Sequence, residues 1–254
     1  MPSLLVSVLD RMFDDAALFP PARLPMAEAL RAHNTAVAGP HGRLVGPFLC
    51  PLTRLDELDA CVASGLPRPD ALGVITYDVA PLGRRPRDIP GLVQFEAPLG
   101  ARPPDLGGRV RLFLEIPRHG AVGDHLDAVR TAGSSAKIRC GGMGRDDVPS
   151  CERVADVLVG CVERGLTVKA TAGLHHPFRT GGPAGHHGFV NLLAAAAAAR
   201  AGRDRATVAT ILTREEPDAH GLVDRLARAR QLLVSVGTCS IDEPVAALVE
   251  RGLL

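Results

Sequence analysis

The sequence predicts an α/β fold, a (β/α)8 barrel of the TIM type formed by one domain over residues 1–254. The chain has 254 residues, and a single barrel of this type is typically about 250 residues long. Short apolar runs alternate with amphipathic stretches, which is typical of βα units around a parallel sheet. About sixty residues separate the last two predicted strands, so we expect an irregular barrel with a helical insertion before the last strand. A doubly wound open sheet is the alternative.

Eight runs of strand length carry this prediction. Each is rich in Val, Leu, Ile or Phe and is bounded by glycine, proline or polar residues. They are a short strand near Ala17–Phe19, followed by Leu44–Pro51, Leu72–Val79, Leu92–Leu99, Val110–Pro117, Ser135–Gly142, Leu166–Gly173 and Leu232–Ser240.

Helical periodicity fills most of the connections between these strands. The linkers over residues 83–90 and 100–108 are exceptions, because they are rich in Pro, Gly and Arg and have no helical period. The predicted helices are Thr53–Ser64, Gly123–Gly133, Ser150–Arg164, the alanine-rich Phe189–Ala201 and Glu243–Arg251.

Composition restricts the partners that we expect. Hydrophobic residues make up 46% of the chain and its formal net charge is +1, which excludes wholesale disorder and argues against a nucleic-acid partner. The six cysteines show no CxxC spacing, and no signal peptide or membrane-spanning run is evident. We therefore expect a cytoplasmic protein with no membrane partner. The oligomeric state stays open, and a homo-oligomer is compatible with the sequence.

The two lysines are the most informative residues. Lys137 and Lys169 are the only lysines among 29 basic residues, a bias typical of a GC-rich genome that replaces most surface lysines with arginine. Both lie in predicted buried strands. A primary amine can lose its proton when buried and can form a Schiff base, whereas a guanidinium can do neither. We therefore predict a functional role for at least one of them.

Strand alternation places five polar side chains on one face of three consecutive strands. They are Glu115, Lys137, Arg139, Lys169 and Thr171, and the apolar residues between them are expected to face the surrounding helices. The polar set then points into the barrel mouth, where enzymes of this fold place their sites. A structural ion-pair network is the alternative interpretation.

The predicted charge of this group suits an anionic substrate. Two lysines and an arginine stand against one glutamate. Neighbouring like charges disfavour ionisation, so Lys137 is expected to lower the pKa of Lys169.

A glycine-rich segment with four histidines follows Lys169. His175, His176, His186 and His187 lie within it, and we expect a mobile lid over the barrel mouth, with His175 and His176 as acid–base groups and Arg179 as a substrate-binding group. A metal site completed by Glu115 or Asp78 is an alternative, as are solvated loop histidines.

Two shorter motifs lie at other predicted strand ends. Ser240 and Glu243 form a capping-box pattern, and with Gly237 the free N–H groups there could cradle a phosphate or carboxylate, with residues 171–173 including Gly173 as the other wall. Asp14 and Asp15 are interpreted as carboxylate acid–base groups or as helix caps. Tyr77 is either a strand-end group or a core phenol.

Several of these motifs together resemble a family of uncharacterised bacterial proteins. The similar segments are FDDAALFPPARLPM, AKIRCGG, VKATAGLHHP with HHGFVNLL, and SVGTCSIDEPV, which span most of the chain. The resemblance implies a common fold and site, and no activity is known to transfer with it. More loosely, a pair of lysine-bearing strands beside an anion cradle is similar in architecture to class I aldolase barrels.

The function predicted from the sequence is an aldolase-like lyase or isomerase that acts on a small anionic carbonyl or phosphorylated compound. Lys169 is the expected Schiff-base nucleophile or general base, Glu115 moves protons and Arg139 holds the anionic group. No cofactor is expected, because no dinucleotide fingerprint or phosphate-binding loop is present. A lyase or hydrolase that depends on a divalent metal, and a non-catalytic protein that binds small anions, are the alternatives.

Overall fold

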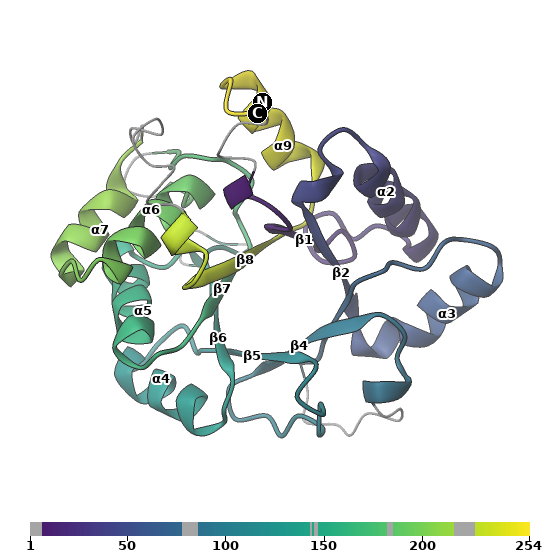
Figure 1. Cartoon of the computed structure of the whole chain (residues 1–254), viewed down its shortest axis with the longest axis horizontal. Helices are drawn as coiled ribbons and strands as arrows, with labels where there is room; N and C mark the ends of the chain where they lie inside the picture. The colour runs from purple at the N-terminus through teal and green to yellow at the C-terminus, as the bar shows by residue number, and fades with distance from the viewer. Residues whose placement is uncertain (1–6, 78–85, 143, 145–146, 182–184, 216–226) are drawn as a thin grey trace.

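Eight parallel strands close into a barrel in the computed structural model of this chain (Figure 1). The structure describes residues 7–77, 86–142, 144, 147–181, 185–215 and 227–254. Each strand pairs with its neighbour in the sequence, and β8 closes the ring on β1, which confirms the predicted barrel over the open sheet. The strands are β1 Phe13–Asp15, β2 Val45–Pro51, β3 Leu72–Ile75, β4 Leu92–Pro98, β5 Arg111–Glu115, β6 Ser135–Arg139, β7 Val168–Thr171 and β8 Leu233–Thr238.

Helices surround most of the ring, but not between β4 and β5. The connection over residues 99–110 is described throughout and holds no helix, as its Pro- and Gly-rich composition predicts. In Figure 1 no α-helix is drawn between α3 and α4, where the β3–β4 and β4–β5 connections run. The α-helices are α2 Met26–Ala38, α3 Leu55–Ala63, α4 Val122–Thr131, α5 Cys151–Glu163, α6 Phe189–Arg200, α7 Arg205–Thr213 and α9 Asp242–Glu250. None of the described helices is long and apolar enough to cross a membrane.

The expected helical insertion before the last strand is present as α6 and α7, which both lie between β7 and β8. Helix α6 is buried on nearly all sides, because α5 and α7 pack around it on the outside of the barrel. The ring of Phe189 in α6 meets the edge of Phe13 in β1, with 5.1 Å between centroids. A run of small alanine side chains suits a helix that is enclosed in this way.

The position of the first strand was predicted wrongly. Ala17–Phe19 form a turn, in which the Phe19 N–H donates to the Ala16 carbonyl, and β1 is the acidic segment Phe13–Asp15. Hydropathy favours the apolar run, yet both aspartates of β1 are buried and paired. Asp14 points into the barrel toward Lys169, and the carboxylate of Asp15 lies 2.9 Å from His33 of α2 on the outside.

The strand predicted over Leu72–Val79 is shorter than expected. It ends at Ile75, and Asp78 and Val79 lie outside the described residues. Tyr77 is 61% exposed, so its interpretation as a core phenol was wrong.

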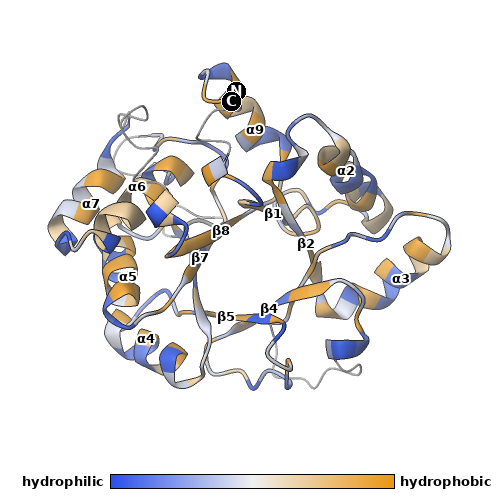
Figure 2. Ribbon diagram, in the orientation of Figure 1, coloured by the Kyte–Doolittle hydropathy of each residue, from blue (hydrophilic) through white to orange (hydrophobic). Residues whose placement is uncertain are grey.

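The main hydrophobic core fills the layer between the strands and the helices. Figure 2 shows apolar residues on the strands and on the inner sides of the helices, with polar residues toward the outside. Strand residues whose side chains alternate outward, such as Phe48, Phe95, Leu114 and Val236, belong to this core. Residues of opposite parity face the barrel axis, where the charged groups lie.

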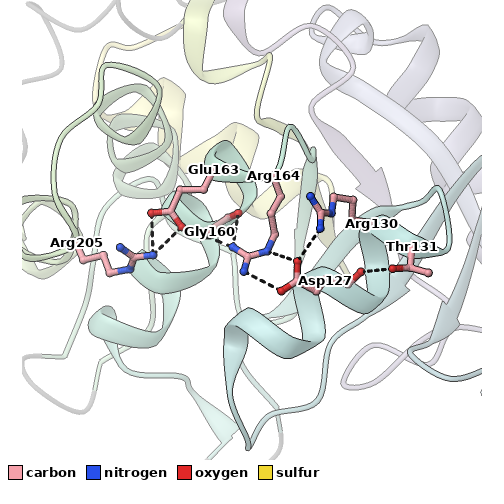
Figure 3. Close-up of polar contacts among 7 residues, drawn as sticks. All are labelled: Asp127, Arg130, Thr131, Gly160, Glu163, Arg164 and Arg205. Atoms are coloured by element: carbon pink, nitrogen blue, oxygen red, sulfur yellow. Dashed lines mark hydrogen bonds and ion pairs between the residues drawn. The ribbon is translucent and has the colours of Figure 1, made fainter.

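The outer layer carries a network of exposed ion pairs over α4, α5 and α7 (Figure 3). Arg164 reaches across from the end of α5 to Asp127 of α4 with two hydrogen bonds of 3.0 and 3.1 Å. Arg205 of α7 binds both carboxylate oxygens of Glu163 at 3.0 and 2.9 Å. We call these four residues the surface network.

Candidate functional site

Five charged side chains form one continuous row inside the barrel. In order of contact they are Asp14, Lys169, Glu96, Lys137 and Glu115, and we call them the charge chain. Lys169 Nζ contacts Asp14 Oδ2 and lies 2.5 Å from Glu96 Oε1. Lys137 Nζ lies 2.6 Å from Glu96 Oε2 and 2.9 Å from Glu115 Oε2. Carboxylates and ammonium groups therefore alternate along the chain, with Glu96 shared by both lysines.

The strand register brings these groups together from five strands. Glu115 of β5 pairs with Lys137 of β6, which pairs with Lys169 of β7. Equivalent positions in neighbouring parallel strands point to the same side of a sheet, so all three side chains enter the barrel. Glu96 of β4 and Asp14 of β1 reach the two lysines from across the ring.

Two uncharged side chains hold the carboxylates in place. Gln94 donates hydrogen bonds to Asp14 Oδ2 at 3.0 Å and to Glu96 Oε1 at 3.1 Å. The Ser235 hydroxyl donates a third bond to Asp14 Oδ2 at 3.0 Å. These polar partners reduce the cost of burying charge.

The charge chain runs from the closed interior toward the open mouth. Lys169 is fully buried and Lys137 is 4% exposed, whereas the Glu115 side chain is 24% exposed. Lys169 also lies over the ring of Phe113, 5.7 Å from its centroid. Glu115 is thus the member of the chain through which solvent or substrate protons would enter.

Opposite charges hold the central groups in their ionised forms. Burial alone would raise the pKa of Glu96, but the Lys137 and Lys169 ammonium groups outweigh it and lower that pKa to about 2. Burial would lower the pKa of Lys137, but Glu96 and Glu115 raise it above its ordinary value. Both shifts follow from opposite charges in contact at low dielectric.

The predicted excess of positive charge is therefore wrong. Three carboxylates face two ammonium groups along the charge chain. The Glu96 carboxylate lies between the two ammonium groups and contacts both, and the pKa of Lys137 is raised by its carboxylate partners. Of the three carboxylates, only Glu115 lies on the three strands from which the charge was predicted.

Strand alternation could have identified Glu96. Gln94 and Glu96 alternate with Val93, Phe95 and Ala97 in β4, the same pattern that singled out Glu115, Lys137 and Lys169. Asp14 is among the predicted carboxylate acid–base groups, but its partner cannot be inferred from the sequence, because β1 begins at Phe13, four residues before the predicted first strand.

The other half of the barrel interior is apolar. Ala16, Leu49 and Ile75 form a separate cluster with Phe19 packed against it. Gly73 of β3 makes this arrangement possible, since a Cβ there would lie 2.5 Å from Leu49 Cδ2 and 2.8 Å from Gln94 Cγ. The charge chain is therefore flanked by a surface that excludes water, which strengthens its electrostatic interactions.

Arg139 is the last residue of β6, two residues after Lys137. It lines a cavity of about 190 Å³. Ser150, Arg153 and Arg118 share this cavity, which lies between the end of β6 and the start of α5. Arg118 is paired with Asp147, and Arg153 donates to two backbone carbonyls. Among the described residues, Arg139 makes no such bond, so its guanidinium is the group in this cavity best placed to receive an anion.

Thr171, Gly173 and Gly237 lie at the ends of β7 and β8, close to Lys169. A Cβ at Gly237 would lie 2.7 Å from Thr171 Oγ1 and 3.8 Å from Lys169 Cε, so a side chain there would clash with Thr171 beside the lysine. Gly173 has a left-handed φ of +70°, and a Cβ there would lie 3.2 Å from His186 and 3.3 Å from Gly141. Close packing and the left-handed backbone therefore require glycine at position 173. The predicted role of Gly173 in substrate binding stays a prediction.

The histidine segment is divided between the mouth and the outer layer. His175 Nδ1 lies 2.7 Å from Glu243 of α9, and His176 is exposed. His187 is buried and binds the Pro149 carbonyl at 2.8 Å, and this burial lowers its pKa. The expected lid remains a prediction, and residues 182–184 lie outside the described part of the chain.

Arg179 does not join the charge chain in any contact that the structure describes. Its backbone N–H donates to the buried Asn191 of α6 at 3.0 Å. Its charge adds to the effect of burial in lowering the pKa of His187, so the guanidinium lies near that histidine.

The capping-box pattern is only half formed. The Glu243 N–H donates to the Ser240 hydroxyl at 3.4 Å, but the Glu243 carboxylate contacts His175 instead of closing the box. No group of three His, Cys, Asp or Glu side chains suited to a metal ion was found among the described residues.

Comparisons of this chain with protein-family models, with curated proteins and with solved structures found no significant match. The site must therefore be interpreted from its own chemistry.

Proposed function

We propose that this barrel is a lyase or isomerase that acts on a small anionic carbonyl compound through a Schiff base on Lys169. The single observation that carries the proposal is the charge chain, in which the only two lysines of the sequence share a buried carboxylate. The Schiff base needs an amine, acid–base groups beside it and a dry site, and these residues supply all three.

A purely structural chain would be poorly suited to this position. Replacing buried ion pairs with well-packed apolar residues is often neutral or stabilises a protein by about 1–4 kcal/mol. The neighbouring cluster of Ala16, Leu49 and Ile75 shows that this barrel can fill its interior with apolar side chains. Retention of two buried ammonium groups next to that cluster therefore favours a chemical role.

Lys169 is the better candidate for the nucleophile. Its ammonium group can pass a proton to Asp14 or Glu96, which both contact it, and the neutral amine can then attack a carbonyl carbon. The carbonyl oxygen leaves as water, so one ammonium and one carbonyl give one protonated imine and one water with no proton consumed. The imine keeps the positive charge and therefore keeps both ion pairs.

Lys137 is better suited to electrostatic stabilisation. Glu96 and Glu115 raise its pKa, so it stays an ammonium group and can stabilise negative charge that develops on the substrate. Glu115 touches Lys137 and is partly exposed, which suits a group that carries protons between solvent and the reacting carbon.

The cavity beside Arg139 supplies the anion-binding part of the proposal. Its guanidinium follows Lys137 at the end of β6 and would hold the carboxylate or phosphate of the substrate. The carbonyl group would then lie toward Lys169, with Thr171 and Gly237 beside it.

Borohydride trapping tests the proposal directly. The protein is incubated with pyruvate, glyoxylate, dihydroxyacetone phosphate and glyceraldehyde 3-phosphate, each with borohydride, and the intact mass and proteolytic peptides are measured. We expect at least one compound to add its reduced mass to the peptide that carries Lys169. Lys169→Met should remove the adduct, and Arg139→Gln should weaken it while leaving Lys169 in place. Absence of any adduct, or an adduct confined to the N-terminal amine, would contradict the proposal.

A further inference from the structure

Cys239, His175 and Glu243 form a second reactive constellation at the barrel mouth. Cys239 Sγ lies 3.7 Å from His175 Nε2, a distance within hydrogen-bond range for sulfur. On the other side of the imidazole, Nδ1 lies 2.7 Å from Glu243 Oε2. Cys239 follows β8, His175 lies in the segment after β7, and Glu243 belongs to α9. Three separate elements therefore bring these residues together.

Glu243 is the carboxylate beside Nδ1 of the imidazole. Its oxygen lies 2.7 Å from that nitrogen as an ion pair, without an in-line hydrogen bond, and its negative charge favours a proton on Nδ1. The lone pair of the neutral ring is then on Nε2, the atom that faces the thiol. A nucleophile, a base and a group that orients the base are the parts required for an activated thiol.

The surroundings of Cys239 keep it a thiol at rest. Burial raises its pKa, the carboxylates of Glu243 and of Asp15 in β1 raise it further, and backbone hydrogen bonds from Ala22 and from Cys239 itself lower it. His175 therefore acts as a base during the reaction instead of holding a permanent thiolate.

Among the described residues, no other cysteine is hydrogen-bonded to a histidine. Cys50, Cys140, Cys151 and Cys161 are buried, and burial raises the pKa of each, to about 12 for Cys50, Cys140 and Cys161. Cys61 is partly exposed like Cys239, but among the described residues no histidine contacts it. It therefore provides an internal control within the same molecule.

The incomplete capping box at the start of α9 is a second reason to consider Cys239, His175 and Glu243 together. Ser240 bonds the N–H of Glu243, so a glutamate in the first turn of α9 is in position to complete the box. Its carboxylate lies at His175 instead. The side chain that would ordinarily stabilise the helix is thus committed to orienting the imidazole.

We propose that Cys239 is a nucleophile activated by His175 and Glu243, and that it adds reversibly to the carbonyl carbon of small aldehydes. As the carbon–sulfur bond forms, the thiol proton passes to His175 Nε2 and the carbonyl π electrons move to oxygen. The imidazolium then returns the proton to that oxygen, which gives a hemithioacetal. Nothing is oxidised or reduced. This proposal does not depend on the Schiff base at Lys169.

Alkylation by iodoacetamide tests the nucleophile. The rates at Cys239 and Cys61 are measured by peptide mass spectrometry between pH 5 and 9, in the wild type, His175→Gln and Glu243→Gln. Assistance by a positioned base is typically worth about 10²–10⁴-fold. We expect Cys239 to react at least about tenfold faster than Cys61 at pH 7, and His175→Gln to remove that advantage without changing the rate at Cys61.

Glu243 is a positioning residue, so its effect should appear in the pH profile. Glu243→Gln should displace the pH dependence of the Cys239 rate to lower pH, because it removes a carboxylate that raises the pKa of the thiol. The groups that act on the thiol are His175, Glu243 and Asp15, and only Glu243 is changed. Equal rates at Cys239 and Cys61 in the wild type, or an unchanged rate in a folded His175→Gln variant, would overturn the proposal.

Protection by glyoxylate tests whether Cys239 adds to an aldehyde. It needs no substitution of Cys239, His175 or Glu243. We expect glyoxylate to slow alkylation of Cys239 at least about tenfold at saturation, as capture of the free thiol requires, whereas oxalate, which has no aldehyde, should not. Repeating the measurement in Lys169→Met separates the two proposals. Protection that persists there belongs to the thiol, and protection that is lost or never seen contradicts addition at Cys239.

Discussion

The charge chain inside the barrel and the surface network on the helices use the same chemistry in opposite surroundings. Asp127 and Arg164 are held by two hydrogen bonds and remain in contact with solvent (Figure 3). Lys169 and Glu96 lie as close together but are fully enclosed. Exposed pairs contribute little to stability, whereas a buried pair costs several kcal/mol per ion in desolvation and requires every partner.

The choice of cation follows the same division. The surface network uses arginine, which is the default basic residue of this chain. The charge chain contains both lysines. Arginine serves well in exposed pairs, so the use of lysine only inside the barrel indicates that the amine itself is needed there.

The largest loss of stability is expected when the carboxylate that both lysines share, Glu96, is removed. Glu96→Ala leaves two buried ammonium groups with one partner each, and breaking a buried pair typically costs about 3–5 kcal/mol. We expect a loss of unfolding free energy in that range, measured by urea denaturation at pH 7. Glu163→Ala in the surface network is the matched control and should leave the midpoint nearly unchanged. Equal effects of the two substitutions would remove the distinction between the regions.

The removal of the nucleophilic lysine comes next. Lys169→Met leaves the buried carboxylates of Asp14 and Glu96 facing each other, and we expect a loss of about 3 kcal/mol at pH 7. Glu96 keeps its contact with Lys137, whereas Asp14 loses its cationic partner. The deficit relative to the wild type should therefore shrink as the pH falls and the carboxylate without a cation takes up a proton. A deficit that is independent of pH would show that lost packing, and not charge, is responsible.

Stability of the wild type should fall in acid for a specific reason. The two ammonium groups lower the pKa of Glu96 from 4.5 to about 2. Its contribution is therefore complete above pH 4.5 and is lost as the pH falls from 4.5 toward 2, by no more than about 3 kcal/mol. The raised pKa of Lys137 acts in the opposite direction. That contribution is complete below the ordinary lysine pKa and is lost at higher pH.

Unfolding curves recorded from pH 2 to pH 11 check both limits. We expect a plateau between about pH 5 and pH 10, since both groups keep their charge throughout that interval. The Glu96→Ala variant should lose the acid limb selectively. If Glu96→Ala lost as much stability as the wild type between pH 4.5 and pH 2, that loss would have to come from other carboxylates.

The smallest effect is expected in the surface network. Asp127→Asn removes the partner of Arg164 and Arg130, but Asp127 and Arg130 are exposed, Arg164 is half-buried, and salt screens such pairs. The thermal midpoint should change little at 0.15 M salt. A large loss there would mean that the helical layer depends on its ion pairs and would weaken the comparison.

The sequence was sufficient for the barrel and for part of the charge chain. Periodicity revealed the strands, and alternation within β5, β6 and β7 placed Glu115, Lys137 and Lys169 on the inner face. The sequence could not reveal the partners that come from across the ring. Glu96 and Asp14 meet Lys169 only because the sheet closes, and closure is a property of the whole barrel that no local pattern contains.

The Cys239 constellation illustrates the same limit. SVGTCSIDEP predicts a helix cap, and the Ser240 contact with Glu243 bears out that half of the pattern. The side chain of Glu243 is captured by His175, which lies 68 positions earlier in the chain. A local motif can predict the backbone geometry, but a competing tertiary contact decides where the carboxylate goes.

The most direct test of the charge chain labels lysine selectively with ¹⁵N at the side-chain nitrogen. Because the chain has two lysines, two side-chain signals are expected. The account predicts that both are ammonium groups protected from exchange with solvent at pH 6, and that Glu96→Ala abolishes the protection of both while Glu163→Ala affects neither. A lysine signal in the wild type with the shift and rapid exchange of a free surface amine would contradict the account.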